Sequence, residues 1–362
     1  MRPSVVALIL ALAALAIVFL VTSVNAYTPR YSPSEIAVDA AGNVYTIMDI
    51  GCFAGEGIFV YGPDGSEIKS ISRPGCSDIV IDGNGTVYVS CLPEKRLERL
   101  VKDDIFSIVW QEQAPGRFIN YIAAGPDNNI LVSNYNYSAQ EVRVTEGCIL
   151  KITPEGKIAG IINSSPEIPL EKYYRMTVSS NGTIYLTNFT RCISVIYPDG
   201  NRSLITHTSP DNGTFSQVQT VEIGADGYLY IGETSNGRVR KLATNGTLIA
   251  QWDGCGPDRF VSPVSIAATR DGRVYVSDMM NQRIVWFDGN RYYFGMNASD
   301  NMAGKGVLWD SVISGDNYTA MWQIIYNETA PGNSIPGFDA PVGLAGLSIA
   351  CLLLVIGRIR KD

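Results

Sequence analysis

Short runs of alternating apolar and polar residues recur along the chain at a nearly constant spacing. Six ten-residue segments align without a gap: 36–45, 79–88, 122–131, 176–185, 221–230 and 266–275. Each opens with an apolar residue, has an aliphatic residue next to last, and carries Gly or Asn three positions before its end. Gly and Asn accept the positive φ of a tight turn, so each segment predicts strand, turn, strand. A period of about 45 residues indicates a repeat architecture.

Further strand and turn signals follow these hairpins. Apolar runs lead into Gly-containing turns at 57–65, 148–156, 192–200, 238–246 and 283–289. Each repeat then supplies four antiparallel strands, which form one blade of a propeller, and a closed ring of blades leaves few long edges exposed. The sequence therefore predicts an all-β fold, a six-bladed β-propeller with four antiparallel strands per blade, over residues 31–295.

The last two repeats carry a more specific pattern. The segment 277–284, Ser-Asp-Met-Met-Asn-Gln-Arg-Ile, follows the strand 273–276, and 233–239 is a near match to it. This pattern resembles the NHL repeat of six-bladed propellers, and it implies that Asp278 braces Arg283 within one blade. The first four repeats keep only the hairpin. The resemblance implies the fold and does not identify an activity, since such propellers include lyases, lactonases, sensor domains and binding platforms.

Composition agrees with stacked strands and excludes one class of partner. The chain has 362 residues, of which 46% are hydrophobic and 17% charged, and it contains 19 Tyr. Its net charge of -7 gives no reason to expect a nucleic acid as partner.

The N-terminal segment predicts export. An apolar run at 5–21 ends near Val24 and Ala26, the small residues of a cleavage site, so residues 1–26 are expected to be a signal peptide. An uncleaved membrane anchor is the alternative. In either case we expect the propeller outside the cell.

The C-terminal segment predicts a membrane or lipid anchor. An apolar run at 340–357 precedes three basic residues, which is typical of a transmembrane helix with a cytoplasmic end. With Pro336, Gly337 and Phe338 before it, residues 336–362 resemble the archaeal PGF-CTERM sorting signal, in which a sorting enzyme removes the helix and a lipid is attached. A simple transmembrane anchor is the alternative. Residues 296–335 would form a membrane-proximal segment, and the expected location is the cell surface.

Many Asn-x-Ser/Thr sequons accompany these export signals. Glycosylation is expected at Asn84, Asn136, Asn163, Asn181, Asn201, Asn212, Asn245, Asn297, Asn317 and Asn327. An eleventh sequon, at Asn188, lies at a strand end and is expected to stay unmodified.

Six cysteines map to one face of the predicted ring, and a seventh, Cys351, lies in the terminal apolar run. An even number in an oxidising compartment indicates disulfides, although six cysteines allow fifteen pairings. Blade positions favour three bonds: Cys76 with Cys91, Cys148 with Cys192, and Cys52 with Cys255. The third would join the first and last repeats as a covalent latch.

The histidine count excludes several kinds of chemistry. The chain has one histidine, His207, and no Cys-x-x-Cys pair, so neither a zinc site rich in histidine nor a Ser-His-Asp triad can be assembled. The histidine-dependent sites of amidating lyases and of virginiamycin-lyase-like propellers are excluded for the same reason. What remains is chemistry carried by side-chain oxygen atoms, chiefly those of carboxyl groups.

The residues just before the six aligned segments are expected to ring one mouth of the central channel. They are Glu35, Asp78, Tyr121, Arg175, Thr220 and Ser265. Glu222 stands two positions further along, where the other repeats carry Ala, Val or Thr. A buried carboxylate needs water, a cation or a partner. Glu222 is therefore expected to pair with Arg175 or with channel water, to bind a ligand or cation, or to act as a catalytic acid.

Together these observations favour a non-enzymatic binding protein. The leading hypothesis is an anchored cell-surface propeller that recognises an extracellular protein, glycan or small ligand at its cysteine-bearing face. Tyr135 and Tyr137 are candidate contacts, and the alternative is that they lie in a loop shielded by a glycan on Asn136. Glu35, Asp78, Tyr121, Arg175 and Glu222 are the candidate ligand-binding residues of the channel. No cofactor is expected, with Ca²⁺ in the channel as an open option. The alternatives are a divalent-cation-dependent lactonase or lyase using Glu222 with Glu35 or Asp78, and a structural component of the cell envelope.

Overall fold

The structure is a computed structural model. It describes residues 32–49, 55–102, 104–138, 143–170, 175–187, 190–206, 208–209, 213–253, 259–288 and 291–297, all within one compact unit that begins at Tyr31. The expected signal peptide, the sorting segment and the terminal anchor lie outside these residues, as do Cys52, Cys255, His207, Asn188, Asn212, Asn317 and Asn327. Within the described ranges, no helix has both the length and the apolar character needed to cross a membrane.

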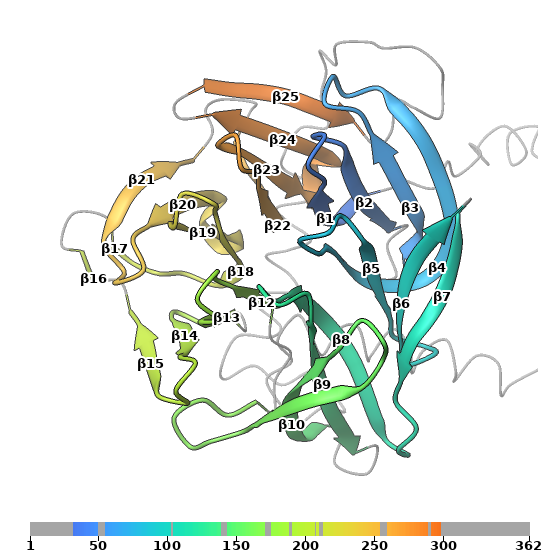
Figure 1. The fold of residues 1–362 in the computed structure, drawn as a ribbon. Helices are drawn as coiled ribbons and strands as arrows, with labels where there is room; N and C mark the ends of the chain where they lie inside the picture. The colour runs from blue at the N-terminus through green and yellow to red at the C-terminus, as the bar shows by residue number, and fades with distance from the viewer. Residues whose placement is uncertain are drawn as a thin grey trace, which may run out of the picture. The chain divides into compact units, whose positions relative to one another are not determined.

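The described residues form antiparallel sheets (Figure 1). A seven-stranded sheet has the order β1 (Ser32–Val38), β2 (Val44–Asp49), β3 (Gly55–Tyr61), β4 (Glu67–Ile81), β5 (Val87–Cys91), β6 (Arg96–Lys102), β7 (Ile105–Gln111). The next sheets contain β8 (Arg117–Ala124), β9 (Ile130–Ser138), β10 (Arg143–Ile152) and β11 (Ile158–Asn163), then β12 (Arg175–Val178), β13 (Ile184–Thr187), β14 (Ile193–Ile196) and β15 (Arg202–Ile205).

Two further four-stranded sheets follow in the described residues. They contain β18 (Val218–Ile223), β19 (Leu229–Glu233), β20 (Arg238–Leu242) and β21 (Leu248–Trp252), then β22 (Pro263–Ala268), β23 (Arg273–Asp278), β24 (Arg283–Asp288) and β25 (Arg291–Asn297). A short hairpin, β16 (Thr208–Ser209) with β17 (Gly213–Thr214), precedes the first of them. The 3₁₀ turns η1 (Thr234–Asn236) and η3 (Met279–Asn281) follow β19 and β23. The predicted all-β, propeller-like fold is confirmed.

The first seven strands differ from the prediction of two separate four-stranded sheets. The outer part of β4, from Glu67 to Ser72, pairs with β3, and its inner part, from Cys76 to Ile81, pairs with β5. The strand continues between these parts, with Gly75 at a positive φ, so one long strand joins what the repeat predicts as two units. The described residues therefore form four four-stranded sheets, one curled seven-stranded sheet and the two-stranded β16–β17 sheet.

The innermost strands contact one another in a closed circuit. β1 lies against β4, β4 against β8, β8 against β12, β12 against β18, β18 against β22, and β22 returns to β1 (Figure 1). The predicted inner turns are confirmed, because Gly42, Gly85, Asn128, Gly182, Gly227 and Gly272 all have positive φ.

The first and last sheets meet without exchanging a strand, since each is built from its own consecutive strands. The Ile36 amide donates to the Ser265 hydroxyl at 3.2 Å, and the Ser277 hydroxyl donates to the Pro33 carbonyl at 2.5 Å. Tyr275 packs in the same hydrophobic cluster as Ile36. Clusters of this kind lie between the other neighbouring sheets as well, so the core consists of layers between sheets rather than one central mass.

Candidate functional site

Four of the residues predicted at the channel mouth form one interacting cluster. Glu35 lies on β1, Asp78 on β4, Tyr121 on β8 and Arg175 on β12. The Arg175 guanidinium forms an ion pair with Glu35 and lies over the Tyr121 ring, with Cζ 4.8 Å from the ring centroid. Only 6% of the Glu35 side chain and 11% of the Arg175 side chain are exposed. We call these four residues the mouth cluster.

The Arg175–Glu35 pair joins strands that are not neighbours. In the circuit of inner strands, β4 and β8 separate β1 from β12 on one side, and β18 and β22 separate them on the other. The ion pair therefore spans the centre of the ring. Ser265, the mouth residue of β22, hydrogen-bonds to Glu35 from the neighbouring strand.

Asp78 is held by backbone amides. Its Oδ1 accepts a hydrogen bond from Ile79 N and its Oδ2 accepts one from Ile122 N, each at 2.8 Å, so the carboxyl links β4 to β8. Burial raises the pKa of Asp78 well above its usual range, and the nearby Glu35 raises it further. Burial also raises the pKa of Glu35, against the opposing effect of Arg175. The positive charge of Arg175 thus opposes the rise in the pKa of both buried carboxyl groups.

Glu222 lies apart from the mouth cluster. It is half-buried on β18, opposite Tyr230 of β19 and close to the inner turn at 224–228. Burial raises the pKa of Glu222 to about 8, partly opposed by a hydrogen bond with Thr177. The expected pairing of Glu222 with Arg175 is wrong, since Arg175 pairs with Glu35.

The position of Glu222 follows from strand periodicity. Side chains two residues apart on a strand share a face and are about 7 Å apart. Glu222 stands two residues beyond Thr220, the mouth position of β18, and at the same level the neighbouring inner strands carry Thr177 and Ala267. A carboxyl group among small side chains therefore lies on the inner-turn side of the Arg175–Glu35 pair.

Replacing Glu222 with glutamine is expected to stabilise the protein more at pH 9 than at pH 5. The ordinary pKa of a glutamate is 4.5 and the folded-state pKa is about 8. A raised carboxyl pKa contributes stability below pH 4.5 that is lost as the pH rises through 8. Glutamine imitates the protonated form and avoids that loss. Melting temperatures of both proteins at the two pH values measure it, and an equal difference at both would contradict the raised pKa.

The carboxylates of the channel do not gather into a cation site. Glu35 is paired with Arg175, Asp78 with two amides, and Glu222 with Thr177. In the part of the chain that the structure describes, no three His, Cys, Asp or Glu side chains form a group suited to a metal ion. Ca²⁺ takes six to eight oxygen ligands, and among the described residues these three carboxyl groups already have protein partners, so Ca²⁺ at the centre of the ring stays an untested expectation.

The ends of the second strands carry bracing residues. Asp278 accepts hydrogen bonds from Val261 N at 3.0 Å and Ser262 N at 2.9 Å, and it forms an ion pair with Arg283 at 3.0 Å. The expected bracing of Arg283 by Asp278 is confirmed.

The equivalent cluster on β19 and β20 was not expected from the sequence. Glu233, fully buried, forms ion pairs with Arg238 and with the fully buried Arg240, and it accepts a hydrogen bond from Ser216 N at 2.7 Å. The cluster could have been predicted from the second hairpin of this repeat. Glu233 pairs with Arg238 across that hairpin, and Arg240 lies two residues later on the same face.

The described cysteines include one close pair. Cys76 and Cys91 face each other across β4 and β5, both buried, with their sulfur atoms 3.3 Å apart. A disulfide bond is about 2.05 Å long, so the two sulfur atoms lie close together without being bonded in this structure, and their predicted bond stays a prediction. Cys148 lies beside Asn134, and Cys192 lies beside Thr190.

One candidate contact residue has a packing role. Tyr135 is 5% exposed and its ring stacks on Phe118, with centroids 6.0 Å apart. The expectation of Tyr135 as a surface contact is wrong. Tyr137 is half-buried near the end of β9 and stays a candidate.

Comparisons with known proteins identify the class of fold. No protein-family model and no curated protein matches the chain. Similar solved structures include virginiamycin B lyase from Staphylococcus aureus, with 18% identity and a TM-score of 0.50 over 72% of this chain and 84% of that one. They also include regucalcin, a calcium-binding protein from Agrobacterium tumefaciens (13%, TM-score 0.51, 69% and 82%), and a gluconolactonase from Xanthomonas campestris (12%, 0.51, 68% and 84%). At these identities the similarity shows a β-propeller fold.

Proposed function

We propose that this chain is a six-bladed propeller that acts on a small ligand at the centre of its ring. The closed circuit of inner strands supports the count of six, with β4 entering the circuit through its inner part. The curled seven-stranded sheet then represents two blades that share β4. NHL-type repeats, with the bracing of Arg283 by Asp278, agree with this proposal.

The observation that carries the function is Glu222. A carboxyl group whose pKa is raised to about 8 changes protonation near neutral pH, as a general acid or base must. It stands on an inner strand, on the inner-turn side of a buried ion pair that spans the ring. We therefore favour acid–base catalysis of the lactonase or lyase class over binding alone. The lyase and the gluconolactonase among the similar structures support this choice of class.

The mouth cluster would orient the ligand. Arg175 Nε is buried and has no hydrogen-bond partner among the described residues. An unpaired buried donor costs about 1–3 kcal/mol, so an oxygen atom of a ligand would be favourable there. Glu35 and Tyr121 hold the guanidinium in place. Arg175 is the candidate for polarising a carbonyl group, and Glu222 for moving a proton.

The proposed chemistry differs from that of the similar lyase. A staphylococcal virginiamycin B lyase in which a histidine is replaced is described as catalytically inactive, with quinupristin bound. The only histidine of the present chain, His207, lies outside the described residues. The proposal therefore assigns the proton transfer to Glu222 and uses neither a histidine nor a cation.

Replacing Glu222 with glutamine is expected to lower kcat by about a hundredfold on any lactone or eliminable ester that the wild-type protein turns over. Product release from a panel of such compounds, followed at pH 6 to 9.5, measures it. If Glu222 is the base, the wild-type rate rises with pH to a plateau above about pH 8. Glu155→Gln, in an exposed turn, is the matched control and should leave the rates unchanged. Equal rates in wild type and Glu222→Gln would contradict the proposal.

A second candidate function is recognition without catalysis at the cysteine-bearing face. The favouring observation is the approach of the Cys76 and Cys91 sulfurs to 3.3 Å, a position from which a disulfide could fix that face. The partner would be an extracellular protein or glycan, and the protein would be exported and anchored at the cell surface as the termini predict. Here Glu222→Gln would leave partner binding unchanged, which separates the two functions.

A further inference from the structure

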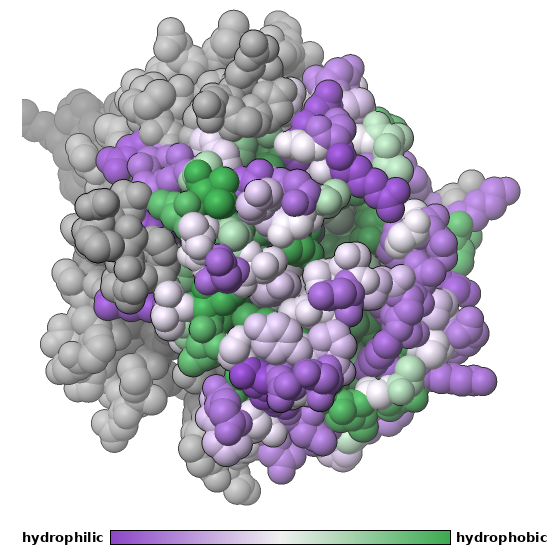
Figure 2. All heavy atoms as spheres, turned by 60° about the vertical axis from the view of Figure 1, so that its left-hand side comes forward, coloured by the Kyte–Doolittle hydropathy of each residue, from purple (hydrophilic) through white to green (hydrophobic). Residues whose placement is uncertain are grey.

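The outer edges of several sheets expose aliphatic side chains. β11, β15 and β21 each end a four-stranded sheet. Roughly half of the surface of Ile161 on β11, Leu204 on β15 and Ile249 on β21 is exposed. Figure 2 shows hydrophobic residues reaching the surface in separate places among polar ones. A strand at a sheet edge with exposed apolar side chains invites pairing with another chain.

A sequon stands beside each of these three strands. Asn163 is the last residue of β11, Asn201 directly precedes β15, and Asn245 lies in the turn before β21. All three side chains are exposed. The coincidence of an exposed sequon with an exposed apolar edge therefore occurs on three successive sheets.

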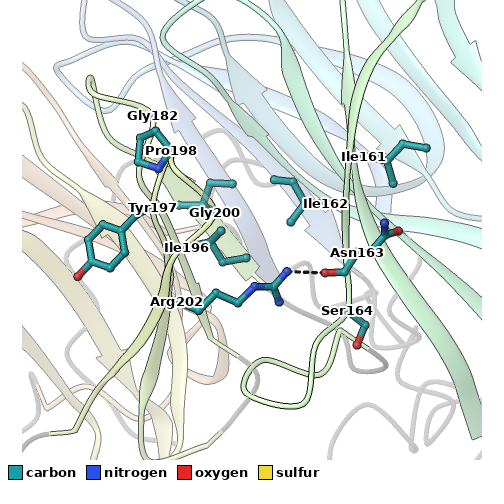
Figure 3. Close-up of a pocket in the computed structure, with 11 residues that line it drawn as sticks. Ile161, Ile162, Asn163, Ser164, Gly182, Ile196, Tyr197, Pro198, Gly200 and Arg202 are labelled. Carbon is teal, nitrogen blue, oxygen red and sulfur yellow. Dashed lines mark hydrogen bonds between the residues drawn. The ribbon is translucent and has the colours of Figure 1, made fainter.

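The geometry is clearest at β11. Asn163 and Ile161 are two residues apart on one strand, so they share a face about 7 Å apart. Figure 3 shows both side chains on one side of β11 and Ile162 on the other, toward a groove of about 410 Å³ between β11 and the β14–β15 hairpin. A group attached to Asn163 would extend over Ile161.

The backbone at Asn163 is held by the next sheet. Arg202 of β15 donates a hydrogen bond from Nη2 to the Asn163 carbonyl at 2.6 Å and one from Nη1 to the Ser165 hydroxyl at 2.8 Å. These bonds hold the backbone carbonyl of Asn163 on the side of β11 that faces Arg202. The side-chain amide of Asn163 therefore lies on the opposite side of the strand (Figure 3).

We propose that Asn163, Asn201 and Asn245 carry N-linked glycans that cover the apolar edges of β11, β15 and β21. The donor would be a sugar chain joined through phosphate to a lipid. A bond forms between the asparagine Nδ2 and the anomeric carbon, the bond from that carbon to the lipid phosphate oxygen breaks, the lipid phosphate leaves, and the Nδ2 atom loses one proton to a base. This modification requires export and is independent of the chemistry proposed for Glu222.

The first experiment measures occupancy. Peptides of the full-length protein, purified from the organism that makes it, are analysed by mass spectrometry before and after release of N-glycans. The peptides containing Asn163, Asn201 and Asn245 should carry a sugar mass that disappears on release with conversion of each asparagine to aspartate. Unmodified peptides at all three positions would overturn the proposal.

The second experiment measures the covering effect. The triple variant Asn163→Gln, Asn201→Gln, Asn245→Gln should show a several-fold larger associated fraction by size-exclusion chromatography with light scattering. The matched control replaces Asn84 and Asn181, exposed in inner turns, and should remain as dispersed as the wild type. Adding Ile161→Lys to the triple variant should reduce its association, because a charge on an edge strand opposes pairing. Equal association of triple variant and control would overturn the covering role.

Discussion

Replacing Arg175 with methionine is expected to lower the free energy of unfolding by about 3–5 kcal/mol, which is typical of removing one partner of a buried ion pair. The variant would leave Glu35 buried without its guanidinium and would place Asp78 beside it without a compensating charge. It would also remove the cation over the Tyr121 ring. Chemical denaturation of the full chain at pH 8 measures the effect.

The second variant needed is Arg175→Met combined with Glu35→Gln. Removing both charges should recover most of the lost stability, because the cost arises from an uncompensated charge rather than from a lost contact. The loss in the single variant should also be smaller at pH 5 than at pH 8. Without Arg175 the already raised pKa values of Glu35 and Asp78 rise further, and the stability of a group with a raised pKa is lost as the pH increases. A loss under 1 kcal/mol at pH 8 would contradict the buried pair.

Replacing Glu233 with alanine is the other substitution for which a loss of about 3–5 kcal/mol is expected. Glu233 is the carboxylate for two arginines, and one of them, Arg240, is fully buried. Burial lowers the pKa of Arg240, and Glu233 is the main charge that opposes this effect. The variant would leave that guanidinium in the protein interior without its carboxylate, and it would also remove the acceptor for the Ser216 amide.

Glu146→Ala is the matched control for Glu233→Ala. Glu146 also pairs with an arginine, Arg117, at 3.1 Å, but 65% of its side chain is exposed. Exposed ion pairs contribute about 0–1 kcal/mol, so this variant should unfold close to the wild type. Equal losses of stability in the two alanine variants would contradict the claim that Glu233 is essential because its arginine partner Arg240 is buried.

The repeat pattern was sufficient to predict the inner hairpins and their turns, but not the continuous strand β4 or the hairpin β16–β17. The inner hairpins depend on local alternation and on residues with positive φ, which a sequence displays directly. The partner of Arg175 could not be predicted in this way. From the sequence Glu222 on the neighbouring strand is a plausible partner, and only the closed ring brings Glu35 within reach.

Other differences have the same origin. The continuity of β4 depends on the segment from Ser72 to Cys76 continuing the strand, with Gly75 at a positive φ, although Pro74 and Gly75 are typical of a break. Tyr135 is buried because Phe118 from a neighbouring strand stacks on it. The burial of Arg240 depends on the arrival of Phe215, whose ring centroid is 5.8 Å away. The continuity of β4 and the burial of Tyr135 and Arg240 thus depend on contacts with residues outside the local sequence pattern.

The contacts between the first and last sheets set a condition on folding. The Ser277 hydroxyl reaches the Pro33 carbonyl across 244 positions of sequence, and the Ile36 amide reaches Ser265 across 229. During synthesis β1 is made first, and these partners become available only after nearly all of the described strands have left the ribosome. Contacts of such long sequence separation form slowly. A chain truncated before β22 would therefore lack the surface that covers β1, and it would expose Ile36 to proteases and chaperones rather than settle into a smaller stable unit.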